Sequence, residues 1–394
     1  MRRTLAVLTL LVALPVLAAT PLSVATPLEG AQHLSRYFAA LREAAAGKKV
    51  VRALHYGDST IAADGIARTV RARLVARFGD AGPGFVSAGM NPQFNQRSDV
   101  DSLRRGDWAT RSILHGGAEG RYGLGGIVGI ARTGASAVIK APDGYSSKYT
   151  KLELWYQAGQ GYGSLWAQAD GAELLRTPAV AEATEDRREV RDLPQGFTTL
   201  TLGAEGGPVP LYGTVLETGA PGATWEARGI IGVGSKSFSA FGPEHLASQM
   251  AARDPDLIVL QIGGNEAGYP VLQSGSGTGY MPIYQAALDR LRGAAPQTDC
   301  LVVTPLDQGE LAEDGVTVRS KPAMKRMVSA QRRVAEASGC GFWSAWDAMG
   351  GEGAIVGWVA RGLAFEDLVH VAGKGQAAVA ERLADALLAA YDAG

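Results

Sequence analysis

Residues 57–59 form a Gly-Asp-Ser tripeptide between the apolar run Val50–Tyr56 and a helical pattern that begins near Ile61. A serine at a tight turn between a strand and a helix is exposed at the edge of a sheet, where α/β enzymes commonly hold a nucleophile. Because the chain contains 52 glycines, such a tripeptide can also arise by chance. Ser59 is therefore a candidate nucleophile only if the chain also supplies a general base and donors for an oxyanion.

A candidate base lies near the C-terminus, where Asp367 and His370 stand three residues apart just before the last helical pattern. Acyl transfer needs an imidazole that accepts the serine proton and a carboxylate that fixes its tautomer. A histidine is more often structural than catalytic, but this position favours the catalytic role. We predict a triad of Ser59, Asp367 and His370. We expect Asp58 to order the turn around the serine and His55 to be a packing or supporting residue.

Two glycine-rich segments can supply donors to an oxyanion. The apolar strand 257–262 ends in Gly-Gly-Asn265-Glu, which puts a side-chain amide at the carboxyl end of a strand, where ligands bind in open α/β sheets. Upstream, Gly232 lies in Gly-Ile-Ile-Gly-Val-Gly, where bare backbone can approach a ligand closely. We predict an oxyanion hole formed by the N–H groups of Ser59 and Gly232 and the side-chain amide of Asn265.

These four blocks (Gly-Asp-Ser, an isolated Gly, Gly-x-Asn and Asp-x-x-His), in this order, resemble the SGNH, or GDSL, hydrolase superfamily. The resemblance implies a flavodoxin-like three-layer α/β/α sandwich, with the family's functional residues at Ser59, Gly232, Asn265, Asp367 and His370.

Within the superfamily, segments 55–59, 78–85 and 263–267 are similar to exported peptidoglycan O-acetylesterases of Gram-negative bacteria. Those enzymes carry a β-sandwich, resembling a carbohydrate-binding module, between the first and second blocks. Two positions depart from them: Thr60 replaces a frequent His, and Gly264 replaces a frequent Thr. Both departures bear on substrate preference more than on the chemistry.

Strands and helices alternate at both ends of the chain, which indicates a parallel sheet covered on both faces. The expected strands lie at 50–56, 257–262, 301–304 and 341–344, and the expected helices at 31–46, 61–78, 243–252, 284–292, 323–338 and 375–391.

The middle of the chain loses the helical period and shows short alternating segments at 151–157, 164–170, 197–202 and 210–216. Asp170-Gly171, at the end of segment 164–170, is a strong hairpin signal. We predict a β-sandwich inserted into the α/β fold. The aromatic residues Trp155, Tyr156, Tyr162 and Trp166 can form either its core or a platform for sugars, and the core is favoured.

The predicted organisation has four parts. They are a signal peptide at 1–25, the first part of the hydrolase domain at 26–105, the β-rich insert at 106–226, and the second part of the hydrolase domain at 227–394. Met1-Arg2-Arg3 precedes an apolar stretch of about 16 residues with small-x-small cleavage motifs, which is typical of an export signal. An uncleaved membrane anchor is the alternative, but the stretch is short and contains Pro15.

Net charge and cysteine content exclude several classes of function. The net charge is −1 and no basic stripe is present, which argues against binding nucleic acid or a membrane surface. With two cysteines and five histidines we expect no metal and no cofactor. Cys300 and Cys340 each begin an apolar run. They can form a disulfide in an oxidising compartment or stay as buried thiols.

We therefore expect a periplasmic or secreted serine esterase that acts on an acetylated glycan, peptidoglycan or another polysaccharide, without stable membrane insertion after signal cleavage. Two alternatives stay open. The same five residues could transfer acetyl to a sugar, or the protein could bind glycans with an inactive site.

Overall fold

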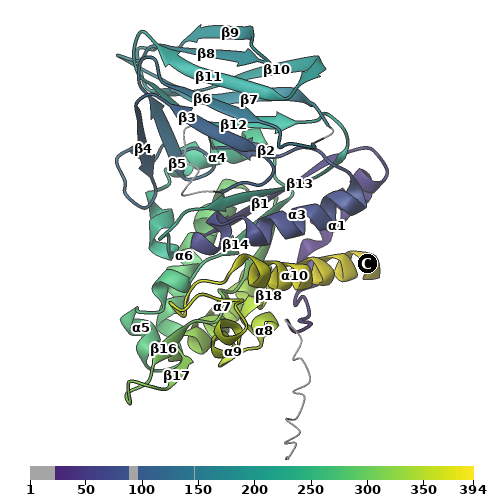
Figure 1. Cartoon of the computed structure of the whole chain (residues 1–394), viewed down its shortest axis with the longest axis vertical. Helices are drawn as coiled ribbons and strands as arrows, with labels where there is room; N and C mark the ends of the chain where they lie inside the picture. The colour runs from purple at the N-terminus through teal and green to yellow at the C-terminus, as the bar shows by residue number, and fades with distance from the viewer. Residues whose placement is uncertain (1–22, 88–95, 146) are drawn as a thin grey trace, which may run out of the picture.

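The computed structural model describes residues 23–87, 96–145 and 147–394 (Figure 1). Residues 1–22 of the predicted signal peptide lie outside this range. None of the helices within the described ranges has the length and apolar character that a membrane span requires.

A five-stranded parallel sheet forms the centre of the α/β part, and its strand order is β13-β1-β14-β15-β18. Its strands are buried along most of their length, as the continuous apolar runs predict. The bounds are Gly222–Gly229 for β13, Val50–Gly57 for β1, Leu257–Gln261 for β14, Asp299–Val303 for β15 and Gly341–Trp343 for β18.

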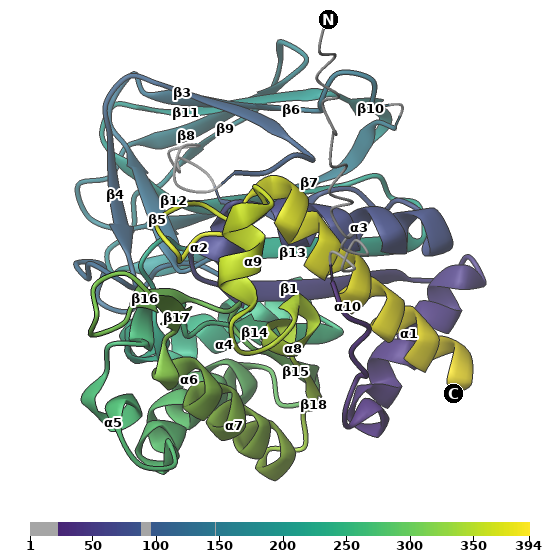
Figure 2. The same cartoon turned by 60° about the horizontal axis from the view of Figure 1, so that its bottom comes forward.

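Helices cover both faces of this sheet, so the predicted α/β/α arrangement is confirmed (Figures 1 and 2). One face carries η1 (Ala31–Leu34), α1 (Ser35–Ala45), α3 (Gly65–Phe78), α8 (Ala345–Met349), α9 (Ala354–Ala360) and α10 (Gly373–Ala393). The other carries η2 (Ser235–Ala240), α4 (Pro243–Arg253), α5 (Pro270–Gln273), η4 (Thr278–Tyr280), α6 (Met281–Ala294) and α7 (Pro322–Ala337).

Two antiparallel sheets pack around a shared apolar core and lie beyond one side of the α/β part (Figure 1). The first contains β10 (Glu185–Phe197), β7 (Tyr149–Ala158), β12 (Val209–Glu217), β5 (Ile127–Ala131) and β4 (Trp108–Ser112), with β2 (Gly84–Val86) on β12. The second contains β3 (Asp101–Arg105), β6 (Ser136–Lys140), β11 (Thr199–Glu205), β8 (Ser164–Ala169) and β9 (Ala172–Pro178).

The strand pairing differs from the predicted limits of the insert, 106 and 226. Strands β2 and β3 lie before residue 106 but pair with β12 and β6 in the antiparallel sheets. Strand β13 begins at Gly222 and pairs with β1 in the parallel sheet. Local pattern does not say which sheet a short strand joins, because that depends on partners far away in the sequence.

Buried charges join the antiparallel sheets to the parallel sheet. Glu226 on β13 accepts hydrogen bonds from Arg253, Arg228 and the Phe85 N–H. Glu217 at the end of β12 pairs with Arg253 at 2.8 Å and with Arg52 at 3.0 Å.

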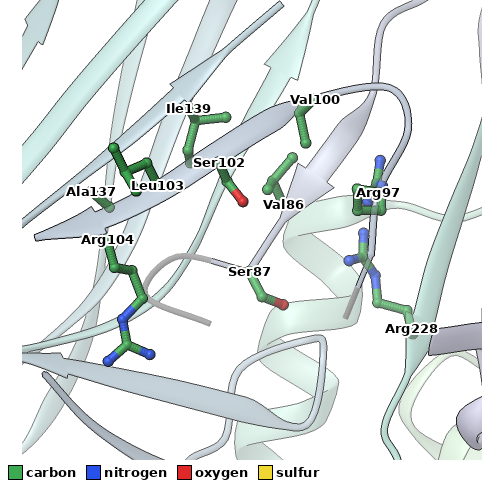
Figure 3. Close-up of a pocket in the computed structure, with 10 residues that line it drawn as sticks. All are labelled: Val86, Ser87, Arg97, Val100, Ser102, Leu103, Arg104, Ala137, Ile139 and Arg228. Atoms are coloured by element: carbon green, nitrogen blue, oxygen red, sulfur yellow. The ribbon is translucent and has the colours of Figure 1, made fainter. Parts of the chain in front are cut away.

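A cavity of about 30 Å³ lies beside this network and is lined by apolar residues, two serines and the three arginines Arg97, Arg104 and Arg228 (Figure 3). Burial lowers the pKa of Arg228 to about 10, with nearby Arg97 acting in the same direction and Glu226 opposing it. The ion pairs of Glu226 and Glu217 hold the antiparallel sheets against the parallel sheet.

The predicted helix at 61–78 is interrupted in the structure. It divides into α2 (Ser59–Ala62) and α3, and Asp64 between them has a positive φ of 60°. The Asp64 carboxylate bonds to Arg71 at 3.0 Å and to the Ser98 hydroxyl at 2.6 Å. These distant partners hold the break, which a local helical period cannot indicate.

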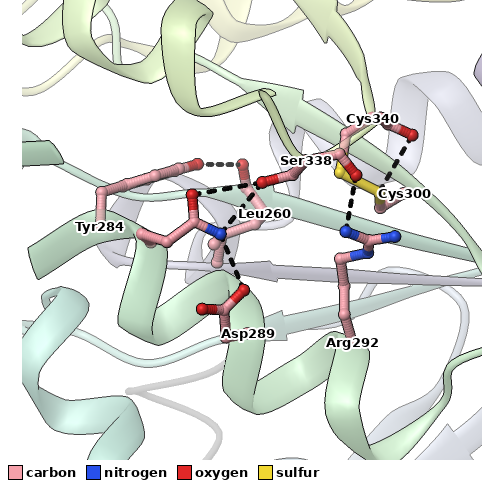
Figure 4. The surroundings of a disulfide bond; sticks show 9 residues. Leu260, Tyr284, Asp289, Arg292, Cys300, Ser338 and Cys340 are labelled. Carbon is pink, nitrogen blue, oxygen red and sulfur yellow. Dashed lines mark hydrogen bonds between the residues drawn. A yellow bond between two sulfur atoms is a disulfide. The ribbon is translucent and has the colours of Figure 1, made fainter. Parts of the chain in front are cut away.

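Cys300 and Cys340 form a disulfide at the end of the sheet opposite the carboxyl ends of its strands (Figure 4). Arg292 on α6 donates to the Ser338 carbonyl at 2.6 Å beside it. The sequence left open a disulfide or two buried thiols, and the structure contains the disulfide.

Candidate active site at the carboxyl edge of the parallel sheet

Ser59 lies two residues after the end of β1, at the first position of α2. The Asp58 carboxylate accepts the Thr60 N–H at 3.0 Å and so caps α2, which confirms that Asp58 orders the turn. Burial raises the pKa of Asp58 despite this bond. Close packing fixes α2 on the sheet: a Cβ at Gly229 of β13 would lie 2.1 Å from the Ala62 nitrogen. Only glycine allows this approach.

The structure brings His370 and Asp367 to Ser59, from a segment 311 residues away in the chain. Ser59 Oγ lies 3.4 Å from His370 Nε2, and His370 Nδ1 lies 2.7 Å from Asp367 Oδ2. The other Asp367 oxygen accepts the backbone N–H groups of Val369 and His370, each at 2.9 Å. This is the geometry in which an imidazole can accept a proton from a serine.

The Asp367 carboxylate is held in its charged form. Partial burial acts to raise its pKa, but the hydrogen bonds from His370 and Val369 outweigh burial and lower the pKa. A charged Asp367 favours the tautomer of His370 that has its proton on Nδ1, and this tautomer leaves Nε2 free to accept a proton from Ser59.

The strand order places the three predicted oxyanion donors in adjacent loops, because β13, β1 and β14 are neighbours. Gly232 has a positive φ of 85°, is exposed, and its N–H makes no bond within the described chain. The Ser59 N–H is in the first turn of α2, where it has no acceptor within the helix. Asn265 Nδ2 donates one hydrogen to the Val233 carbonyl at 2.9 Å, and its second hydrogen is available to a ligand.

Glu266 is a supporting residue that the sequence interpretation missed. It is fully buried and accepts bonds from the Ser235 N–H at 2.8 Å, the Ser235 hydroxyl at 3.0 Å and the Tyr280 hydroxyl. Burial raises its pKa. Together with Asn265 it ties the loop after β13 to the loop after β14. In the sequence, this role of Glu266 was indicated only by its position next to Asn265.

Gln308 is a second missed residue, in the loop after β15. Its Nε2 donates to the Gly264 carbonyl at 3.1 Å, and its Oε1 accepts from Lys321 at 2.9 Å. The next residue, Gly309, donates its N–H to the Leu368 carbonyl at 2.7 Å. A Cβ at Gly264 would lie 2.8 Å from Gln308 Nε2, so a larger residue here would require the end of the Gln308 side chain to shift. Gln308 follows a parallel strand. The rule that ligands bind at the carboxyl ends of such strands, which identified Asn265, therefore also applied to Gln308.

Other candidates lie away from this edge. His55 is buried in β1, accepts the Trp225 indole N–H at 3.2 Å, and burial lowers its pKa to about 3. His245 forms a second imidazole–carboxylate pair, with Asp186 at 2.7 Å, but its other nitrogen accepts the Gly123 N–H. Both of its ring nitrogens are therefore occupied. In the sandwich, Trp155 and Tyr156 are buried, as the core interpretation expects, whereas Tyr162 and Trp166 are half-buried.

The match to a known protein family covers four of the five predicted site residues. Residues 195–378 match the model of the GDSL-like lipase/acylhydrolase family. This range contains Gly232, Asn265, Asp367 and His370 but begins after Ser59, which the antiparallel sheets separate from the other four. No curated protein matches the sequence.

Among solved structures, a peptidoglycan O-acetylesterase is similar with a TM-score of 0.76 and 25% identity, over 91% of this chain and 97% of that chain. A salicylyl-acyltransferase from a tetracycline biosynthetic pathway (TM-score 0.28, 15% identity, 77% and 96% coverage) is too distant to inform this chain. The same holds for a family two carbohydrate esterase from Clostridium thermocellum (0.30, 14%, 70% and 97%). The matched family model and the shared fold both support the assignment of the chain as an SGNH, or GDSL, hydrolase with the fold of an ester hydrolase.

Proposed function

We propose that this protein is an exported serine esterase that removes O-acetyl groups from peptidoglycan or another polysaccharide. The observation that carries the proposal is the hydrogen-bonded line from Ser59 to His370 to Asp367, beside the free Gly232 N–H and the Asn265 amide.

In the first half of the reaction, His370 Nε2 accepts the proton of Ser59 as Oγ attacks the acetyl carbonyl carbon. The carbonyl oxygen becomes an oxyanion, which the N–H groups of Ser59 and Gly232 and the Asn265 amide stabilise. The bond from the carbonyl carbon to the sugar oxygen then breaks, and His370 gives its proton to that oxygen. The products are a free sugar hydroxyl and an acetyl-serine.

In the second half, water replaces the sugar. His370 accepts a proton from the water as its oxygen attacks the acetyl carbon, and the same donors stabilise the second oxyanion. The bond to Ser59 Oγ breaks and Oγ takes the proton back from His370, which releases acetate. A sugar hydroxyl in place of this water would make the reaction an acetyl transfer.

Three observations support a large extracellular substrate. The side chains of His370 and Asp367 are 52% and 48% exposed, so a polymer can reach them without the opening of a lid. The disulfide between Cys300 and Cys340 suits an oxidising compartment such as the periplasm, in line with the predicted export signal. The structural relative with the same overall architecture is a peptidoglycan O-acetylesterase.

Acetate release tests this proposal directly. Purified protein should release acetate from p-nitrophenyl acetate and from O-acetylated peptidoglycan, and Ser59→Ala should lose at least about 10⁴ in kcat on both. Ser248→Ala, at an exposed serine of α4, is the matched control and should keep full activity. Equal activity of wild type and Ser59→Ala would rule out the proposed nucleophile. Activity on the small ester but not on any acetylated glycan would leave an esterase with another substrate. Added glycan acceptor that suppresses acetate release would indicate transfer.

A further inference from the structure

A groove of about 510 Å³ lies beside the candidate triad. One wall begins at Ala63, whose N–H bonds to the Ser59 carbonyl at 3.1 Å, one turn after the nucleophile. The opposite wall is made by Phe365 and Val371, which lie on either side of His370 in the chain, and by the start of α10. The groove therefore adjoins the site at both Ser59 and His370.

The chemistry of the proposed reaction determines which part of the substrate lies on this side. The carbonyl oxygen must point toward Gly232 and Asn265, and the leaving sugar oxygen must lie next to His370, which returns the proton to it. The sugar ring that bears the ester therefore lies on the His370 side, where the groove is.

Phe365 presents a ring suited to that sugar. The residue is 56% exposed and lines the groove. Its backbone is held in place, since its N–H donates to the His370 carbonyl at 2.8 Å and its carbonyl accepts the Leu368 N–H at 3.1 Å. An exposed aromatic ring on a fixed backbone offers a flat apolar surface with little loss of conformational entropy on binding.

The charged side chains that line the groove leave one positive charge without a partner. Asp64 is neutralised by Arg71, at 3.0 Å. Arg97 is neutralised by Asp99, at 2.6 Å. Arg68 is exposed on the first turn of α3, and its guanidinium makes no hydrogen bond or ion pair within the described chain. A ligand in the groove therefore meets a free guanidinium, which binds carboxylates well.

From these observations we infer that the groove is the subsite for the acetylated sugar, with Phe365 under the ring and Arg68 on a carboxylate close to the ester. The inference rests on the proposed function and narrows the class of substrates. The preferred substrate is an O-acetylated glycan that carries carboxylates, as opposed to a neutral one.

The test compares two forms of one substrate. O-acetylated peptidoglycan fragments are used with their carboxylates free and after conversion of these carboxylates to amides, and kcat/KM is normalised to that for p-nitrophenyl acetate. For wild type, amidation should lower the normalised kcat/KM about fivefold. Arg68→Gln should lower the normalised kcat/KM by a similar factor on fragments with free carboxylates. It should also abolish the difference between the two forms of the substrate. Arg68→Lys should restore part of the difference, because it keeps the charge. Phe365→Ala should lower the normalised kcat/KM about tenfold on both forms of the substrate.

Arg333→Gln, at an exposed arginine of α7, is the matched control for loss of a surface charge. It should leave the preference for the carboxylate form unchanged. If wild type deacetylates both forms equally and Arg68→Gln changes nothing, the inference fails while the proposed function stands. If wild type hydrolyses p-nitrophenyl acetate but neither glycan, the proposed function fails and the inference fails with it.

Discussion

Asn265 donates its side-chain amide to the backbone carbonyl of Val233 at 2.9 Å. This bond joins the loop after β14 to the loop after β13, and Val233 is the residue next to Gly232. One of the predicted oxyanion donors therefore also sets the position of another. The bond is possible because β13, β1 and β14 are adjacent in the sheet, so that their carboxyl ends meet at one edge.

Asn265→Ala should lower kcat on p-nitrophenyl acetate by about 10²–10³, the typical cost of one oxyanion donor. KM should change much less, because the oxyanion exists only in the transition state. Steady-state kinetics measure both values. Asn265→Asp is the companion variant: it keeps the size of the side chain but cannot donate, so it should be equally impaired. A loss of less than about fivefold in both would remove Asn265 from the oxyanion hole.

Asp367→Asn should lower kcat by about 10²–10⁴, because the Asn side chain carries no charge and its NH2 group can donate to Nδ1, which favours the wrong tautomer of His370. Asp367 also accepts two backbone N–H groups, so part of the effect can come from a distorted loop. Labelling by a serine-reactive phosphonate measures the reactivity of Ser59, and thermal unfolding reports on disruption of the loop. The label should attach to Ser59 in the wild type and more slowly in Asp367→Asn, whose thermal unfolding should be nearly unchanged. Attachment to another serine in the wild type would contradict the assignment of the site.

Glu217→Gln should destabilise the protein at neutral pH and reduce its sensitivity to acid. Burial raises the pKa of Glu217, but the ion pairs with Arg253 and Arg52 outweigh burial and bring the pKa to about 2, below the usual 4.5. A lowered pKa means stability that is present above about pH 4.5 and is lost as the pH falls toward 2, worth up to about 3 kcal/mol.

Urea unfolding at pH 7 and pH 3 measures this effect. The free energy of unfolding should be about 3 kcal/mol lower in Glu217→Gln at pH 7, and the gap to wild type should be smaller at pH 3. Glu313→Gln, at an exposed glutamate outside the network, is the control and should follow wild type at both pH values. An equal gap at both pH values would show that Glu217 is not the titrating group.

Loss of the disulfide should lower stability and leave catalysis intact. Cys300 and Cys340 are 40 residues apart, and closing a loop of that length stabilises a protein by about 4 kcal/mol in the chain-entropy description. The bridge lies at the opposite end of the strands from Ser59. A Cys300→Ala/Cys340→Ala variant should therefore unfold at a lower temperature and keep its kcat on p-nitrophenyl acetate. An unchanged melting temperature, or a large loss of kcat, would contradict this.

Patterns within one element were predictable from the sequence. The last helix was expected at 375–391 and spans Gly373–Ala393, because its apolar residues repeat with a helical period. The hairpin at Asp170-Gly171 was also found: both residues have positive φ, as the turn between β8 and β9 requires. Strand β10 was not predicted, since its sequence is rich in charged residues and is set by pairing with β7.

By itself the sequence determined the α/β alternation, and it predicted the five site residues Ser59, Gly232, Asn265, Asp367 and His370, because each stands close to a strand end or a helix start that its own neighbours specify. Only the tertiary structure decided how these residues are held. Glu266 and Gln308 bind loops that are distant in the chain, β2 and β3 join the antiparallel sheets, and Arg68 and Phe365 come from segments about 300 residues apart to line one groove. Contacts of this kind depend on which strands lie side by side, and no local pattern encodes that order.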